Sequence, residues 1–123
     1  HCGACHRLGS EGHVVGPDLA SLSNKSNEAL LVAVLDPNRA VEWHYKVFHA
    51  VTKDGRLHAG MVAEEASGSV TLAAADGQRT VLLRSELEEL RETEKSLMPE
   101  GLESSLGPSD LSDVFSYVRS SAR

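Results

Sequence analysis

Aromatic side chains are scarce in this chain of 123 residues, at 4% of the total. They are Trp43, Tyr45, Phe48, Phe115 and Tyr117. Large apolar side chains supply much of the buried area of a small domain, so this chain has little material of its own for a core. The composition is therefore compatible with a bound apolar group that fills part of the interior.

Long apolar runs and an excess of basic residues are also missing. The longest apolar run covers residues 29–35, whereas a membrane helix needs about 20 residues, so we expect no membrane span. The chain has 12 basic and 18 acidic residues, and the net charge of −6 excludes a nucleic-acid backbone as a partner. The acidic excess is concentrated in residues 85–123. The length predicts one domain over residues 1–123.

The only two cysteines lie at the start of the chain, in His1-Cys2-Gly3-Ala4-Cys5-His6, which excludes a disulfide framework. Three interpretations compete for this hexapeptide. Zinc could take His1, Cys2, Cys5 and His6, but these adjacent ligands would crowd one turn. A redox dithiol needs a strand before the first cysteine, and residue 1 leaves no room for one in this chain.

The third interpretation, covalent haem, is favoured by the spacing. Two residues between thiols on a helical turn let Cys2 and Cys5 reach the two vinyl-derived carbons of one haem. His6, the next residue, then lies under the iron as an axial ligand. The predicted cofactor is one thioether-linked haem c per chain.

A haem that transfers electrons needs a second axial ligand, and Met98 is the main candidate. It lies in Ser96-Leu97-Met98-Pro99-Glu100-Gly101-Leu102, a loop whose backbone is restricted by Pro and Gly. Met61 lies in an alternating stretch and is expected to be a core residue of a strand. The chief alternatives for the distal position are three histidines of the middle region, His44, His49 and His58.

Three further residues are candidates for contacts with the cofactor. The carbonyl of Pro17, in Gly16-Pro17-Asp18-Leu19, is expected to accept a hydrogen bond from the His6 ring and to fix its tautomer. Arg39 and Trp43 are candidate donors to the haem propionates. A turn arginine and a core tryptophan are the alternative interpretations of those two residues.

These motifs together resemble the haem-binding cytochrome c domain of planctomycete and verrucomicrobial type, over essentially the whole chain. The matching segments are Cys2-Gly3-Ala4-Cys5-His6, Gly16-Pro17-Asp18-Leu19, Leu35-Asp36-Pro37-Asn38-Arg39, Thr52-Lys53-Asp54-Gly55-Arg56, Gly60, Val70-Thr71-Leu72 and Ser96-Leu97-Met98-Pro99-Glu100-Gly101-Leu102. The resemblance implies that Cys2 and Cys5 hold haem c and that His6 and Met98 ligate the iron. It also implies that the chain is part of a larger exported protein.

The expected fold class is α+β: a small helical cytochrome c-like haem domain interrupted by a four-strand antiparallel β meander. The helix that precedes the haem motif in cytochrome c folds is missing, which suggests a fragment or absent upstream residues. Residues 27–35 are predicted as a helix that ends at Asp36-Pro37. A C-terminal helix is predicted from Leu111, Val114, Phe115 and Val118, with Ser109 as its N-cap.

The β insert is predicted over residues 43–84, where the apolar period changes to two. Its strands are expected at 45–52, 57–64, 69–75 and 78–84, with turns at Asp54-Gly55 and Asp76-Gly77. A capping box formed by Ser85 and Glu88 predicts a short helix through Leu90.

Two functions follow from the haem interpretation. The first is a one-electron carrier with His/Met ligation, which leaves no open position on the iron. The second is a haem-based sensor or small-ligand binder whose distal ligand is labile. No nucleophile–base pair stands elsewhere in the sequence, so we do not expect an enzyme. The expected location is periplasmic or otherwise exported, and the expected partner is a redox protein with a basic docking face.

Overall fold

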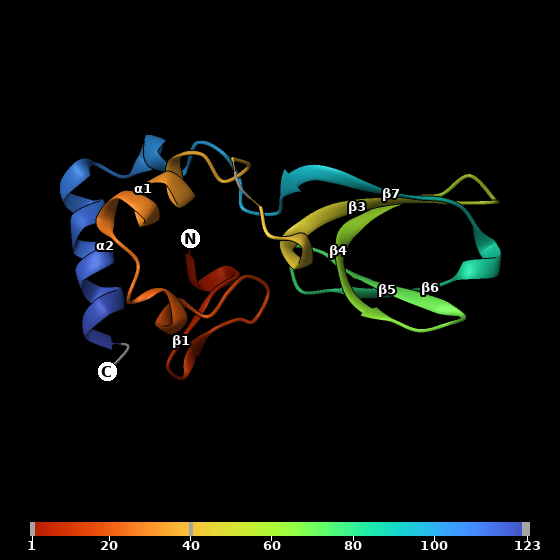
Figure 1. Cartoon of the computed structure of the whole chain (residues 1–123), viewed down its shortest axis with the longest axis horizontal. Coiled ribbons are helices and arrows are strands. Elements are labelled where there is room, and N and C mark those ends of the chain that lie inside the picture. The colour runs from red at the N-terminus through yellow and green to blue at the C-terminus, as the bar shows by residue number, and fades with distance from the viewer. Residues whose placement is uncertain (1, 40, 122–123) are drawn as a thin grey trace. The chain divides into compact units, whose positions relative to one another are not determined.

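The computed structural model describes residues 2–39 and 41–121, and the chain divides into two compact units (Figure 1). Unit 1 consists of His1–Arg39 and Met98–Arg123, and unit 2 consists of Ala40–Leu97. Because unit 1 is built from both ends of the chain, the Cys2–His6 motif and Met98 belong to the same unit.

Unit 1 contains the longer helices, of which α1 (Asn27–Leu35) was predicted to the residue. The side chain of Ser26 caps it by accepting a hydrogen bond from the N–H of Ala29 at 3.1 Å. The helix ends at Leu35, and Asp36 is its C-cap, because the ring of Pro37 disfavours helical backbone in the residue before it. Both boundaries are therefore set by local sequence.

The C-terminal helix α2 (Pro108–Ser121) is present, but its first turn differs from the prediction. Ser109 lies inside the helix and is not its N-cap. Pro108 occupies the first helical position, where a missing N–H has no cost, and the carboxylate of Asp110 accepts the N–H of Gly107 at 2.8 Å. No helix of the described residues is long and apolar enough to cross a membrane.

The core of unit 1 lies between these two helices, which lie side by side in Figure 1. Leu30 of α1 packs with Leu111 and Phe115 of α2, and all three are buried. The predicted apolar stripe of the last helix is thereby confirmed. Four half-buried side chains complete the cluster, namely Leu22, Val34, Leu106 and Val114. Leu22 comes from the one-turn helix η2 (Leu19–Leu22), and η5 (Leu102–Ser105) contacts α1.

The N-terminal segment of unit 1 is a turn followed by a very short hairpin. The turn is η1 (Cys2–Ala4), and the hairpin pairs β1 (Arg7–Leu8) with β2 (Glu11–Gly12). Gly9, at φ 64°, allows the chain to reverse within two residues. The hairpin returns the chain toward the cysteine motif.

Unit 2 is a five-stranded antiparallel sheet with the order β6-β5-β4-β3-β7. Its strands are β3 (Lys46–Thr52), β4 (Leu57–Glu65), β5 (Ser69–Ala73), β6 (Arg79–Leu83) and β7 (Leu87–Ser96). The one-turn helix η3 (Trp43–Tyr45) precedes the sheet, and η4 (Arg84–Glu86) joins its two edge strands. The four strands predicted from the period-two pattern are present.

The sheet bends sharply along β4, which is visibly curved in Figure 1. The first part of β4, through Gly60, pairs with β3, and the rest, from Met61, pairs with β5. A Cβ on Gly60 would lie only 2.6 Å from the carbonyl oxygen of Ala73, so the bend requires glycine here. One cluster of buried side chains in unit 2 consists of Phe48, Ala50, Val70, Leu72 and Leu82.

The predicted fold class is wrong. The chain is mostly sheet, with a five-stranded and a two-stranded antiparallel sheet and two α-helices among the described residues. This does not fit a small helical cytochrome c domain that carries a four-strand insert. The fifth strand, β7, occupies the segment in which the capping box of Ser85 and Glu88 predicted a helix.

Irregular pairing between β7 and β3 explains the error. Thr52 pairs with Leu87 and Val51 with Glu89, so β7 carries one extra residue at this step. That bulge brings Leu87 and Leu90 to the same face although they are three residues apart. The helix was predicted from the capping box of Ser85 and Glu88, a local signal that does not register the pairing of this segment with β3. Only one turn of 3-10 helix, η4, forms near the predicted cap.

Candidate functional site

The cysteine motif forms a single closed turn at the start of unit 1. The carbonyl oxygen of Cys2 accepts the N–H of Cys5 at 3.1 Å and that of His6 at 2.9 Å. Both cysteines are present as thiols, with Cys2 exposed and Cys5 half-buried. The turn therefore places the two thiols and the following imidazole on one short stretch of backbone.

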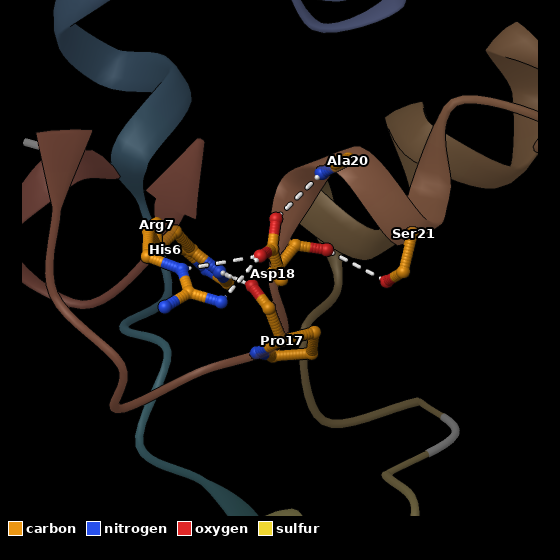
Figure 2. Close-up of polar contacts among 6 residues, drawn as sticks. All are labelled: His6, Arg7, Pro17, Asp18, Ala20 and Ser21. Carbon is orange, nitrogen blue, oxygen red and sulfur yellow. Dashed lines mark hydrogen bonds and ion pairs between the residues drawn. The ribbon is translucent and has the colours of Figure 1, made fainter. Parts of the chain in front are cut away.

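The ring of His6 is held by the segment that follows the small hairpin. Its Nδ1 lies 2.7 Å from the carbonyl oxygen of Pro17, as Figure 2 shows. A carbonyl can only accept, so Nδ1 carries the proton and the Nε2 of a neutral ring carries the lone pair. This is the tautomer that a metal-ligating histidine needs. The hydrogen bond expected from the sequence is thus present, while the role of His6 as an iron ligand stays a prediction.

Two glycines allow the chain to approach His6 closely. A Cβ on Gly16 would lie 2.6 Å from Cε1 of the His6 ring, and one on Gly12 would lie 2.0 Å from the His6 carbonyl oxygen. Gly12 also has a φ of 91°, which other residues rarely adopt. The ring of His6 therefore rests directly against backbone at position 16, and any side chain there would displace it.

A second contact joins the same two segments one residue further along. Arg7 donates from Nε and Nη2 to Oδ2 of Asp18, at 3.2 and 3.1 Å (Figure 2). The other carboxylate oxygen of Asp18 accepts the N–H of Ala20 at 2.9 Å, which caps η2. The hydrogen bond from Ala20 and that from Arg7 lower the pKa of the Asp18 carboxyl, so this group is ionised at neutral pH.

Residues 13–16 also fold back on the cysteine motif. The carbonyl oxygen of Cys5 accepts the N–H groups of Val15 and Gly16, at 2.9 and 2.7 Å. Nδ1 of His13 lies 2.9 Å from the carbonyl oxygen of Gly3, between the two cysteines. The sequence interpretation gave no role to Arg7, Asp18 or His13, although Asp18 lies in the quoted segment Gly16-Pro17-Asp18-Leu19.

Met98, the predicted distal ligand, is half-buried and belongs to unit 1 together with His6. Its loop is anchored to the end of α1, because Nδ2 of Asn38 donates to Oε1 of Glu100 at 2.5 Å. Gly101 follows at a φ of 84° and precedes η5. The structure thus gives the loop a defined backbone, and the ligand role of Met98 stays a prediction.

The two candidates for propionate contacts fall in different units. Arg39 is an exposed residue after α1, and its N–H donates to the carbonyl oxygen of Asp36 at 3.1 Å. Trp43 lies in η3 of unit 2, where its ring packs edge-on against Phe48 at a centroid distance of 5.9 Å. Half of Trp43 is exposed. Their contacts with a cofactor remain predictions.

The remaining sulfur and imidazole candidates all lie in unit 2. Met61 is 8% exposed in β4, which confirms its interpretation as a core residue of a strand. His44 stacks edge-on with Trp43 and Tyr45 in η3. His49 and His58 are half-buried in β3 and β4. Nε2 of His58 is buried and has no hydrogen-bond partner in the described residues.

The acidic segment around the predicted distal ligand is divided between the units. Five of its carboxylates lie in η4 and β7 of unit 2, namely Glu86, Glu88, Glu89, Glu92 and Glu94. Glu100 and Glu103 lie in unit 1 with Met98. In unit 2, Lys46 bonds Glu92 at 2.7 Å, and this contact raises the pKa of the lysine. Glu100 and Glu103 are thus the members of this run that belong to the unit of Met98.

Within residues 2–39 and 41–121, no three His, Cys, Asp or Glu side chains are grouped to hold a metal ion. The zinc interpretation included His1, which lies outside the described residues. Haem iron needs only two protein ligands, because the porphyrin supplies the other donors.

The residues of unit 1 fit a haem c in two respects. The thiols and His6 follow one another on one turn. The His6 ring also presents the tautomer that a metal-ligating histidine needs.

A scan against models of protein families finds no match for this chain, and no curated protein matches it.

Proposed function

We propose that this chain is a c-type cytochrome domain that carries one electron on a haem c joined to Cys2 and Cys5. The observation that carries the proposal is the 2.7 Å hydrogen bond from Nδ1 of His6 to Pro17. It supports an axial role for His6 because it leaves the lone pair on Nε2, directly after the second cysteine of a C-x-x-C pair. When bound, haem supplies one-electron chemistry at its iron.

Met98 is the proposed distal ligand. Its membership in the unit of His6, and the anchoring of its loop through Asn38 and Glu100, support this choice over Met61, which packs in the sheet of unit 2. A thioether is a soft ligand that favours ferrous iron, so the pair of His6 and Met98 gives a higher potential than two imidazoles. His6 and Met98 would together hold the iron and leave it no open position for a substrate, so the proposed role is that of a carrier and not of an enzyme.

The proposed setting is an exported compartment, in which c-type attachment takes place, and the proposed partner is a redox protein with a basic docking face. The net charge of −6 supports such a partner, because opposite charges steer encounter. In unit 1, the exposed residues Glu100 and Glu103 follow Met98 in the chain and would contribute to that field.

Acid–acetone extraction of protein expressed in the periplasm with a c-type maturation system tests the proposal. The pigment should stay on the wild-type chain, because thioether bonds survive extraction. Cys2→Ser and Cys5→Ser should each leave one bond, and the double variant should lose its haem to the solvent. Colourless wild-type protein, or pigment that extracts freely from it, would refute the proposal.

A haem-based sensor or gas binder is the second candidate, because the hydrogen bond from Asn38 to Glu100 that holds the Met98 loop lies at the exposed surface. Carbon monoxide added to the reduced protein separates the two functions. A carrier with a firm thioether ligand should keep its spectrum, whereas a sensor with a labile ligand should show the shifted bands of a carbon monoxide complex.

A further inference from the structure

The ion pair between Arg7 and Asp18 is one residue removed from the hydrogen bond between His6 and Pro17. His6 thus bonds Pro17 and Arg7 bonds Asp18, and Figure 2 shows the two contacts together. The Pro17 carbonyl is held on one side by its own ring and on the other by the anchored Asp18. Movement of Asp18 would therefore move the acceptor that fixes the His6 ring.

Asp18 is in turn anchored to the core of unit 1. Its carbonyl oxygen accepts the hydroxyl of Ser21 at 2.6 Å, and its Oδ1 accepts the N–H of Ala20. Both residues belong to η2, which contacts α2 and contributes Leu22 to the buried cluster. A chain of contacts thus leads from the helix core through Asp18 to Arg7 and His6.

The exposure of the pair argues against a purely stabilising role. The side chains of Arg7 and Asp18 are 49% and 33% exposed. Ion pairs at such exposed sites contribute little to folding stability. Two donors of one guanidinium on a single carboxylate oxygen do, however, restrict the direction in which the two segments can shift.

We infer that Arg7 and Asp18 are positioning residues that keep the Pro17 carbonyl on Nδ1 of His6 and thereby set the electron donation of this ligand to iron. The inference rests on the proposed function. A hydrogen bond to a neutral acceptor makes the imidazole more basic, and a more basic imidazole favours ferric iron. Loosening of the pair therefore raises the reduction potential.

The test compares Arg7→Gln and Asp18→Asn in the haem-loaded full chain. Asparagine keeps an oxygen that can cap η2, so the variant removes the ion pair and leaves the turn. Both variants should raise the reduction equilibrium constant by up to about tenfold, which is ~59 mV for one electron. They should also speed solvent exchange of the His6 Nδ1 proton in the reduced protein.

The sign of the shift in Arg7→Gln separates positioning from a simple field effect. Loss of a positive charge near iron lowers the potential through space, whereas loss of a negative charge raises it. A higher reduction potential in both variants therefore indicates an effect that acts through the His6 ring. The potential of the double variant should then shift no further than that of either single variant. A fall in Arg7→Gln, or shifts that add, would overturn the inference.

Arg56→Gln is the matched control, because Arg56 pairs through Nε with Asp54 at 3.0 Å in unit 2. It should leave the potential and the exchange rate unchanged. If no haem attaches to the wild-type chain, the proposed function fails by itself. The positioning role is then read from the haem-free chain, in which Arg7→Gln and Asp18→Asn should shift the His6 ring from the Nδ1–H toward the Nε2–H tautomer. An unchanged tautomer there would overturn the inference.

Discussion

The carbonyl oxygen of Pro17 lies 2.7 Å from Nδ1 of His6, across a separation of eleven residues. The hairpin of β1 and β2 closes this distance, and glycines at 12 and 16 remove the side chains that would block it. A turn that carries two thiols and an oriented imidazole is thereby formed by local contacts within residues 2–18.

Gly16→Ala should displace the His6 ring, because the added methyl would lie 2.6 Å from Cε1. We expect a loss of roughly 1–3 kcal/mol in the free energy of unfolding of the haem-loaded chain, measured with urea. Gly68→Ala is the control, since nothing lies within 4 Å of its new Cβ. Equal losses in the two variants would show that Gly16 does not hold the ring.

Met98→Ala should abolish the weak long-wavelength band that sulfur ligation gives the oxidised protein, and should let added imidazole bind the iron. Absorption spectra with and without imidazole measure both effects. Met61→Leu changes a buried sulfur of β4 at similar volume and should leave the spectrum intact. An unchanged spectrum in Met98→Ala would assign the distal position to another residue.

Thr52→Val should raise the pKa of Asp54 toward its ordinary value. The hydroxyl of Thr52 bonds this carboxylate, and that hydrogen bond is the main cause of the lowered pKa. A lowered pKa in the folded state contributes stability above the unfolded pKa, and this contribution is lost as pH falls through the folded pKa.

The variant should therefore lose less stability on acidification than the wild type does. Carboxyl chemical shifts of Asp54 during a pH titration measure the pKa directly. Thr52→Ser keeps the hydroxyl and should titrate as the wild type does. If serine and valine shift Asp54 alike, packing of the Thr52 methyl and not its hydroxyl controls the group.

Leu30→Ala should destabilise unit 1, because Leu30 is 8% exposed and joins α1 to Leu111 and Phe115. Removal of a buried leucine side chain costs about 2–5 kcal/mol. Leu35→Ala in the same helix removes a side chain that is 41% exposed and should cost much less. Urea unfolding followed by helical circular dichroism makes the comparison, and similar losses would contradict the assigned core.

The variant Glu100→Gln/Glu103→Gln should slow electron exchange with a basic redox protein and weaken its dependence on salt. Salt screens the interaction between surface charges beyond about 10 Å at 0.1 M. Electrostatic steering is therefore visible as an electron-exchange rate that falls as the salt concentration rises. Glu88→Gln/Glu89→Gln removes two charges from β7 of unit 2 and is the matched control. Equal effects of the two pairs would move the docking face away from the Met98 loop.

Several elements follow from local sequence alone. α1 has a capping serine, a compact apolar run and a proline after its end, and each signal acts within a few residues. The strands from 46 to 83 alternate in polarity, and they are separated by turns at Asp54-Gly55, Ser67-Gly68 and Asp76-Gly77, so their positions were predictable. The hydrogen bond of His6 to Pro17 was also foreseen, since the motif needed an acceptor and proline offers a rigid one.

Tertiary structure alone decided the identity of β7 and the neighbours of His6. Leu87 and Leu90 suit one face of a helix as well as a bulged strand, and only the open edge of β3 selects the strand. Arg7 and Asp18 form an ion pair because the small hairpin reverses the chain between them. Their residue types alone do not predict that they pair with each other. Local patterns fix what a segment can form, whereas contacts between distant segments choose among forms of similar local energy.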